Sequence, residues 1–494
     1  MQAISEADIK VRIASDNPWW ANDQYIIPEA AFARRVYFHP FKRLALNFEI
    51  KRATVLLGPR RVGKTFMIKQ LVHEAITSGI LPTDILYVSV DTPIYSGMSL
   101  EKMYGFMPPR NGTSKRVVIF DEIQYLRDWE IHLKDLVDNS TNVKFIVSGS
   151  AAAALQLKSR ESGAGRFSDF MLPPLTFFEF LLFLGEEEKF IQCVDQGPKK
   201  PLLYDVKDID GLNSRFVDYL NYGGYPEAVV NEQIRQNPEQ FIKNDIIDKV
   251  LLKDLPSLYG ITGIQELNKL FSFLAYNAGN EASLENICQE SGLSKPTIKR
   301  YIEYLESAFL IIKVSTVDDN CKTMKRERNF KIYLNNPSMR AALFAPVHPD
   351  DSQRIGQLAE CAIFSQWQHS NKFESLRYAR WKDGGEVDIV YLMSNQKPRW
   401  VGEIKWSDRI DSHWGDETKG IANMLRRHPG ILEAFISTKT ISRDGTLEGR
   451  PFQLIPSAAY CYRVGRNITY RLDNPLVTNT VEEAVKEEEV ATET

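Results

Sequence analysis

The fold of this chain is decided by residues 51–72, KRATVLLGPRRVGKTFMIKQLV. Residues 54–57 form an apolar run that predicts a short buried strand. The strand leads into GPRRVGKT, residues 58–65, which fits the pattern Gly-x-x-x-x-Gly-Lys-Thr, and apolar residues after it continue as a helix. Strand, glycine loop and helix are typical of a phosphate-binding loop, because backbone N–H groups and a helix N-terminus attract phosphate oxygens. We therefore expect an α/β fold that binds a nucleoside triphosphate.

The residue types in this loop predict how the phosphates are held. Lys64 is expected to reach the β- and γ-phosphates and to act in catalysis, and the Thr65 hydroxyl to bind Mg²⁺. The expected nucleotide-binding residues are the loop, the residue after it and one distant arginine: Gly58, Pro59, Arg60, Arg61, Val62, Gly63, Lys64, Thr65, Phe66 and Arg166. Residues 1–50, with several aromatic and basic side chains, are expected to form helices that pack beside this site.

A second strand ends in two acids, VVIFDE at residues 117–122. Asp121 is expected to help hold the metal, and Glu122 to orient or deprotonate the attacking water as the catalytic base. Two acids after a strand are weak evidence alone, because many strands end in a solvated carboxylate. They follow Lys64 by 57 positions in the same expected domain, and this spacing favours a nucleotide site.

Two further features each allow two interpretations. Ser148 and Ser150, at the end of the strand predicted at 144–150, would either sense the γ-phosphate or terminate the strand as a turn. Arg160 and Arg166 would either reach the γ-phosphate of a neighbouring subunit or lie on the surface.

Composition sets the broad class. The 494 residues are enough for about three domains at roughly 150 residues each, and 43% apolar content is ordinary for a globular protein. A net charge of −3 argues against a surface that binds polyanions everywhere. The five cysteines include no Cys-x-x-Cys pair, and the N-terminus has no apolar signal-like core. We expect a soluble, cytoplasmic protein without a membrane partner.

Five segments in order carry a family resemblance: GPRRVGKT, IFDEIQYL, IVSGSAAAALQ, GRFSDFMLPPLTFFEFL and YLNYGGYPEAVV, within about residues 50–260. They resemble a large bacterial and archaeal family of AAA-type P-loop ATPases fused to a C-terminal domain. The resemblance implies ATP and Mg²⁺ as cofactors, a parallel sheet with a helical lid, and continuation through a winged helix into a nuclease-like fold to about residue 475.

The expected domain organisation follows from this resemblance and from local patterns. The Gly223-Gly224-Tyr225-Pro226 box would either approach the nucleotide or make a tight turn before a helix that starts at Pro226. The expected segments are a helical lead-in at 1–50, the ATPase core at 51–180, a helical lid at 181–264, a winged helix at 265–343, a nuclease-like domain at 344–475 and an acidic, disordered tail at 476–494.

The expected winged helix has a short helix at 284–290 and a second helix that Ser294 caps. Cations on the outer face of the second helix and on a hairpin before residue 330 form a DNA-binding pattern, although such modules also serve in packing or partner binding. These cations are Lys295, Lys299, Arg300, Lys322, Lys325, Arg326 and Arg328.

Residues 355–440 contain a second set of acids. Asp388 and Glu403, fifteen positions apart on strands expected to be neighbours, would bind one Mg²⁺. Lys405 shares a strand face with Glu403 and would position the attacking water. The order of an acidic helix residue, an Asp and then Glu-x-Lys resembles the PD-(D/E)xK nuclease fold, and this resemblance implies Glu360 of the preceding helix as a further metal ligand. Glu386-Val387 stands where that fold often has a proline before the Asp. The alternative is a catalytically inert relative in which these charges form salt bridges.

Together these patterns predict an enzyme that hydrolyses ATP and thereby controls a Mg²⁺-dependent nuclease-like module acting on nucleic acid, DNA above all, in DNA processing or defence. The alternative is a nucleotide-driven regulatory switch whose C-terminal domain binds a protein partner and cuts nothing. A weaker third hypothesis is a transcription regulator that acts through the winged helix. The resemblance leaves two oligomeric states open: AAA-type relatives often assemble into homo-oligomers, because an arginine of one subunit can complete a neighbour's site, whereas STAND-like relatives can stay monomeric until activated.

Overall fold

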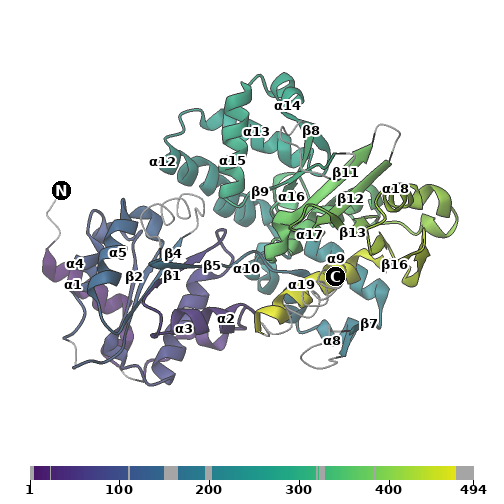
Figure 1. The fold of residues 1–494 in the computed structure, drawn as a ribbon. Helices are drawn as coiled ribbons and strands as arrows, with labels where there is room; N and C mark the ends of the chain where they lie inside the picture. The colour runs from purple at the N-terminus through teal and green to yellow at the C-terminus, as the bar shows by residue number, and fades with distance from the viewer. Residues whose placement is uncertain are drawn as a thin grey trace, which may run out of the picture. The chain divides into compact units, whose positions relative to one another are not determined.

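The computed structural model describes residues 5–22, 24–109, 112–149, 165–194, 203–318, 321, 329–381 and 385–473. The chain divides into two compact units, Met1–Pro174 and Leu175–Thr494, and Figure 1 labels the elements of each. The finer expected division into lid, winged helix and nuclease-like domain stays a prediction. Several residues singled out above lie outside the described residues: Ser150, Arg160, Lys322, Lys325, Arg326, Arg328 and the tail at 476–494.

The first unit is a parallel α/β structure, as the sequence predicts. Its first four strands are largely apolar and buried, a pattern typical of parallel sheets that helices cover on both faces, whereas the fifth strand is partly exposed. Its elements are α1 (Glu6–Asp16), α2 (Phe38–Ala45), β1 (Ala53–Leu57), α3 (Lys64–Thr77), β2 (Ile85–Ser89), α4 (Leu100–Tyr104), β3 (Arg116–Asp121), α5 (Trp129–Asn139), β4 (Val143–Gly149) and β5 (Phe167–Met171).

The strand order of this sheet, β2-β3-β4-β1-β5, brings the two sequence motifs together. Strand β4 lies between β1 and β3, and every neighbouring pair is parallel. The carboxyl ends of β1 and β3 therefore lie at the same edge of the sheet, one strand apart. The glycine loop follows β1 there, and Asp121 ends β3.

The N-terminal segment covers the outer strand of this sheet. Asn17 bonds both backbone groups of Tyr87 on β2, its Nδ2 lying 2.8 Å from the carbonyl oxygen and its Oδ1 2.7 Å from the backbone nitrogen. The indoles of Trp19 and Trp20 donate to the Ile85 carbonyl. These contacts satisfy an exposed strand edge, which otherwise pairs with other chains. The expectation that residues 1–50 pack beside the nucleotide loop is therefore wrong for this aromatic pair, which lies three strands from β1.

The second unit begins with a helical region. Pro226 starts a helix, as the second interpretation of its glycine box predicts, and a Cβ on Gly224 would lie 2.3 Å from the Asn336 side chain. The elements are α7 (Phe177–Leu184), α8 (Glu187–Phe190), the antiparallel pair β6 (Ile191–Val194) and β7 (Leu203–Val206), α9 (Ile209–Tyr222), α10 (Pro226–Val230), α11 (Glu232–Gln236), the π-helices η6 (Glu239–Asp248) and η7 (Val250–Asp254), and α12 (Leu255–Tyr259).

A three-stranded antiparallel sheet with helices follows. The two helices expected near 284–308 are present, and the Ser294 side chain accepts a hydrogen bond from the Thr297 backbone, as an N-cap does. The elements are α13 (Ile264–Tyr276), β8 (Glu281–Ser283), α14 (Leu284–Ser291), α15 (Lys295–Ser307), β9 (Ile311–Ser315), β10 (Asn329–Leu334) and α16 (Ser338–Leu343). The sheet order is β8-β10-β9, so β10 is the central strand.

The last part of the chain forms a six-stranded mixed sheet in the order β11-β12-β13-β14-β16-β15. Thr316, just after β9, forms a bridge with Tyr378 of β11 and so joins the small sheet to the large one. The elements are α17 (Ser352–Trp367), β11 (Leu376–Trp381), β12 (Gly385–Leu392), β13 (Pro398–Glu403), α18 (Trp414–Arg427), β14 (Glu433–Thr438), β15 (Arg443–Leu447), β16 (Arg450–Pro456) and α19 (Ser457–Asp473).

Helices cover both faces of this large sheet. On β14, Ala434 and Ile436 pack into a core cluster with residues of α18, whereas Phe435 between them stacks on Tyr460 of α19. Because successive strand residues point to opposite faces, α18 and α19 lie on opposite sides of the sheet. Helix α17 lies on the side of α19, which it contacts extensively.

Strand β13 is shorter than the sequence predicts. The sequence places Lys405 on the same strand as Glu403, but β13 ends at Glu403. Beyond it, the Ile404 backbone donates to Asp388 Oδ2 at 2.9 Å and the Lys405 backbone to Ser437 Oγ at 2.8 Å. Side chains thus take the hydrogen bonds that a neighbouring strand would provide, and the pairing stops.

Candidate functional site

The phosphate-binding loop is shaped by glycines that no other residue can replace without strain. A Cβ on Gly58 would lie 2.2 Å from the Leu172 carbonyl oxygen, which is closer than van der Waals contact allows. Gly63, at φ 94°, is the N-cap of α3, and Arg61 also has a positive φ of 64°. The loop therefore turns sharply into the helix N-terminus, where free backbone N–H groups and the helix dipole attract anions.

Lys64 is buried against this loop. Its Nζ donates to the carbonyl oxygens of Gly58 at 2.9 Å and of Pro59 at 2.7 Å. A buried ammonium whose bonds include backbone carbonyls carries a charge that an anionic phosphate can neutralise. Arg35, from the segment before α2, donates to the Val62 and Pro173 carbonyls and so holds the outside of the loop.

Asp121 connects β3 to the loop. Its Oδ2 accepts hydrogen bonds from the Thr65 hydroxyl at 2.8 Å and from the Tyr87 hydroxyl at 2.9 Å, and its Oδ1 accepts from the Ser148 hydroxyl. A hydroxyl oxygen and a carboxylate are the hard donors that Mg²⁺ prefers, so these residues fit the ion that the sequence predicts. Ser148 contacts Asp121, which neither interpretation of this serine anticipated.

Glu122 follows Asp121 in a left-handed conformation with φ 56°, and Gln124 donates to its carboxylate. Burial raises the pKa of the Glu122 carboxyl; attraction from Lys64 opposes this shift and repulsion from Asp121 adds to it. A carboxylate with a raised pKa is a stronger base toward water than an exposed one.

The remaining expected nucleotide residues lie in different places. Arg60 donates to the Tyr125 hydroxyl at 3.0 Å, and Phe66, exposed on α3, packs edge-on against Phe32. Arg166 precedes β5, and its carbonyl accepts from Ala53 at the start of β1, so it lies at the opposite edge of the sheet from the loop. It pairs with Asp138 and is no part of this subunit's phosphate site; a contact with a neighbour's phosphate stays a prediction.

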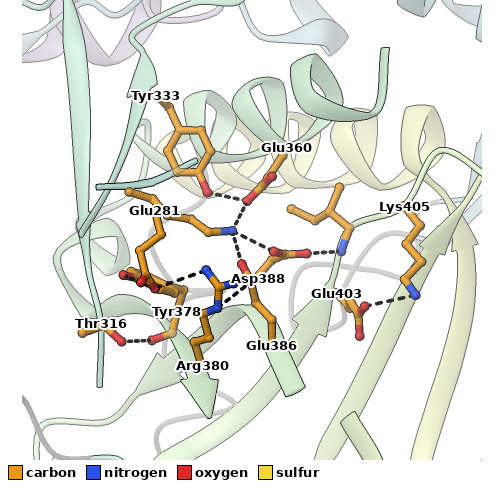
Figure 2. A network of polar contacts seen from close by, with 12 residues as sticks. Glu281, Thr316, Tyr333, Glu360, Tyr378, Arg380, Glu386, Asp388, Glu403 and Lys405 are labelled. Atoms are coloured by element: carbon orange, nitrogen blue, oxygen red, sulfur yellow. Dashed lines mark hydrogen bonds and ion pairs between the residues drawn. The ribbon is translucent and has the colours of Figure 1, made fainter. Parts of the chain in front are cut away.

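The second set of acids, which Figure 2 labels, is organised around a lysine. Nζ of Lys331, on β10, lies 2.8 Å from Glu360 Oε1 on α17, and 2.6 Å and 3.0 Å from Glu386 Oε1 and Asp388 Oδ1 on β12. Tyr333, also on β10, donates to Glu360. We call Lys331, Glu360, Glu386 and Asp388 the ammonium cluster.

Glu403 and Lys405 form a separate pair beside the ammonium cluster. Lys405 Nζ lies 3.1 Å from Glu403 Oε1 and 2.5 Å from Glu417 Oε2 on α18. Glu403 Oε2 is buried and has no hydrogen-bond partner among the described residues. The structure thus pairs Glu403 with Lys405, as expected, while Glu360 and Asp388 share Lys331.

Burial dominates the protonation of two of these acids. It raises the pKa of Glu360 to about 7, with repulsion from Asp388 adding to the effect and Lys331 opposing it. It also raises the pKa of Glu403 to about 7, where attraction from Lys405 opposes burial and repulsion from Asp388 adds to it. Both carboxyls therefore titrate near neutral pH.

The donor set fits a divalent ion only in part. Three carboxylates on α17, β12 and β13 are suitable oxygen ligands, and Glu403 Oε2 is an unsatisfied one. However, across the described ranges no three His, Cys, Asp or Glu side chains are arranged to hold a metal ion. The Lys331 ammonium lies between Glu360 and Asp388, where two of the expected ligands would meet the ion.

Two of the expected DNA-binding cations on α15 have acidic partners. Lys295 pairs with Glu285, and Lys299 Nζ lies 4.0 Å from Glu303. Arg300 is exposed on the same helix. The hairpin cations expected beside them lie outside the described residues.

Sequence reasoning missed Tyr87, Lys331, Tyr333, Glu386 and Glu417. For the β10 pair a signal exists: in Phe330–Leu334 the apolar residues 330, 332 and 334 alternate with Lys331 and Tyr333. A lysine and a tyrosine on one face of an otherwise buried strand indicate a polar partner there. The polar partners are Glu360 and Asp388, which lie 29 and 57 positions after Lys331 and so could not be identified from the strand itself.

Comparison with known families identifies two segments. A model described as an AAA domain matches residues 50–181, and a domain of unknown function (DUF8612) matches residues 213–350. The first unit carries a P-loop domain of the AAA type. This agrees with the parallel sheet and the glycine loop described above.

Three relatives align with more than half of the chain. A Methanocaldococcus jannaschii protein named as uncharacterized is 23% identical over 363 residues, which cover 71% of this chain and 75% of the relative. A second one from that organism is 25% identical over 354 residues, 69% and 73% of the two chains. An uncharacterized Haemophilus influenzae protein is 26% identical over 278 residues, 53% and 62%.

A solved structure of a Thermotoga maritima RuvB variant covers 56% of this chain and 88% of its own at 15% identity. Its TM-score of 0.25 is too low to carry an argument. Within the part of the chain that the structure describes, no helix has the length and apolar character needed to cross a membrane.

Proposed function

We propose that this chain is a Mg²⁺-dependent ATPase. The observation that carries the proposal is the hydrogen bond between Thr65 of the loop and Asp121 of β3. It brings together, at one sheet edge, the hydroxyl and the carboxylate that a phosphate-transfer site uses to hold Mg²⁺. The AAA-domain match over residues 50–181 supports it. Thr65 would hold the ion directly and Asp121 through its water shell; bound Mg²⁺ supplies charge neutralisation on the phosphates.

The chain's own residues account for the rest of the reaction. The ammonium of Lys64 would exchange its carbonyl partners for phosphate oxygens, and the helix N-terminus of α3 would stabilise the same charge. Glu122, with its raised pKa, would orient water and accept its proton, while Gln124 holds the carboxylate in place.

The test is ATP turnover by the full chain and two variants. Lys64→Ala should lose nucleotide binding and turnover together, whereas Glu122→Gln should retain binding and lose turnover by about 100-fold or more. Asp128→Asn is the matched control, because Asp128 is an exposed acid six positions after Glu122 with its side chain 55% exposed. Turnover unchanged in Glu122→Gln would refute the assignment of the base.

We further propose that ATP hydrolysis is coupled to a nuclease-like module acting on nucleic acid, formed by residues 344–475 after a winged helix at 265–343. Strand pairing supports this: Ile389 is in register with Gly402, so Asp388 and Glu403 lie on neighbouring strands. The contact of Lys405 with Glu403 and the unpaired Glu403 Oε2 also favour it. In this proposal Asp388 and Glu403 would hold the metal and Lys405 the attacking water.

Incubation with linear, circular and single-stranded DNA and with RNA tests this coupling, in Mg²⁺ or Mn²⁺ with and without ATP. Cleavage by the wild type and none by Asp388→Asn would support the nuclease. The control is Asp416→Asn, an exposed acid in the first turn of α18. No cleavage under any condition, with ATP turnover intact, would favour the regulatory switch whose C-terminal fold binds a partner.

A further inference from the structure

Lys331 lies on one sheet of the second unit, and its ammonium contacts carboxylates on another sheet. It lies on β10, the central strand of the three-stranded sheet, whereas Glu386 and Asp388 lie on β12 of the six-stranded sheet. Figure 2 labels the three acids that its ammonium contacts, Glu360, Glu386 and Asp388. The lysine side chain is only 4% exposed, so its charge is removed from water.

The three N–H groups of the ammonium match the three carboxylates around it. A lysine ammonium has three donors and no acceptor, and Nζ of Lys331 lies within 3.0 Å of one oxygen from each of Glu360, Glu386 and Asp388. Attraction from these acids outweighs the effect of burial and raises the pKa of Lys331 above its ordinary value. The lysine is therefore charged at neutral pH.

The second oxygen of Asp388 is also engaged. Asp388 Oδ2 accepts the Ile404 backbone N–H at 2.9 Å, so both oxygens of this carboxylate have partners. Glu360 Oε1 accepts from both Lys331 and the Tyr333 hydroxyl. A divalent ion needs the same oxygens at about 2.0–2.6 Å and would stand next to the ammonium, where like charges repel.

The contact is reinforced by further polar bonds between the two sheets. Glu281 of β8 accepts from the Tyr378 hydroxyl of β11 at 3.2 Å and lies 3.8 Å from Arg380 on the same strand. Asn329, at the start of β10, donates to Glu281 at 2.7 Å. With the bridge of Thr316 to Tyr378, these bonds hold β10 in the position that directs Lys331 into the acids.

We propose that Lys331 is a built-in counter-ion that occupies the place of a divalent cation between Glu360 and Asp388, so that this cluster accepts metal only when the ammonium is withdrawn. The three-stranded sheet thereby controls the acids of the six-stranded sheet. The inference rests on the proposed metal-ligand role of Asp388, but its test measures metal binding, so it can fail or hold independently of DNA cleavage.

The test is Mn²⁺ binding to the full chain without nucleotide, measured at neutral pH from the electron paramagnetic resonance signal of free Mn²⁺. Lys331→Met removes the charge and keeps an unbranched side chain. Lys313→Met is the matched control, because Lys313 lies on β9 opposite Ile332 of the same sheet. Lys331→Met should bind one more Mn²⁺ than either the wild type or Lys313→Met. Its affinity for this extra Mn²⁺ should be at least ten-fold higher than that of the other two proteins. Adding Asp388→Asn to Lys331→Met should abolish the gain.

Two results would overturn the proposal. One is a Mn²⁺ site in the wild type that Asp388→Asn abolishes. This result needs only the wild type and Asp388→Asn, so it can be obtained even if Lys331→Met fails to fold. The other is a folded Lys331→Met chain that binds no more Mn²⁺ than the control. A gain of Mn²⁺ without cleavage of any nucleic acid would support the counter-ion and count against the nuclease.

Discussion

Asp121 in the first unit and Asp388 in the second are both buried aspartates on a β-strand, but their neighbours differ in charge. Asp121 accepts from three neutral hydroxyls, those of Thr65, Tyr87 and Ser148. Asp388 accepts from a lysine ammonium and a backbone N–H. Neutral donors orient a carboxylate without cancelling its charge, whereas an ammonium neutralises it.

The donors around a buried carboxylate therefore decide whether it can bind a cation. A carboxylate surrounded by hydroxyls remains an attractive place for a cation, because none of the side chains that donate to it carries a positive charge. A carboxylate paired with a buried lysine is stabilised by the pair, and the pair must be broken before another cation enters. The predictions below test the two arrangements against each other.

The largest expected effect is on catalysis in the first unit. Asp121→Asn keeps the size of the side chain and removes its charge, so the Thr65 hydroxyl loses its anionic partner. We expect ATP turnover to fall by about 100- to 1000-fold, as for other single groups that stabilise charge in a transition state. Asp388→Asn, the equivalent change in the second unit, should leave basal ATP turnover unchanged; equal losses in both variants would refute the comparison.

The next effect is on stability in the second unit. Lys331→Met leaves three carboxylates without their shared ammonium, and we expect a loss of about 3 kcal/mol in the free energy of unfolding. Chemical denaturation of the wild type and the variant measures this difference in the free energy of unfolding. Adding Glu360→Gln to Lys331→Met should recover part of the loss, because one uncompensated charge is removed; a further loss would contradict the ion-pair account.

A smaller effect concerns pH. Burial raises the pKa of Glu403 from its ordinary 4.5 to about 7, so the folded state holds a proton that the unfolded chain releases. Such a group contributes stability that is present below about pH 4.5 and is lost as the pH rises through about 7. Glu403→Gln should therefore gain stability relative to the wild type across this window, by about 1–3 kcal/mol at pH 8.

The pH prediction is checked by unfolding curves of both proteins at pH 5 and pH 8. Glu433→Gln, an exposed glutamate on β14, is the control and should show no such change. A Glu403→Gln chain whose advantage is the same at both pH values would disprove the raised pKa as its cause.

The smallest effect is expected at Ser148. Ser148→Ala removes one of three hydroxyl donors to Asp121 and leaves the carboxylate charge in place. One neutral hydrogen bond contributes about 1 kcal/mol, so ATP turnover should fall about five-fold. A loss as large as that of Asp121→Asn would mean that Ser148 acts on the nucleotide itself.

Local sequence patterns predicted the loop and the acids of the site in the first unit, but not the hydrogen bonds that Tyr87 and Ser148 donate to Asp121. The strand at 53–57, the loop at 58–65 and the helix after it are one local motif, and the strand ending in Asp121 was predicted from its own apolar run. A phosphate loop is made largely of backbone groups at fixed spacing, so its residues need no distant partner to be recognised. Even the two-strand juxtaposition follows from general rules for parallel sheets.

The tertiary structure alone decided how charge is distributed in the second unit. Sequence patterns predicted α17, β12 and most of β13, and with them Glu360, Asp388 and Glu403. They did not predict Lys331, because it lies in a different sheet and meets these acids only where Thr316 bridges to Tyr378. Strand periodicity predicts the face of the sheet on which a side chain lies. Which charged residue packs against that face depends on elements that are distant in the sequence.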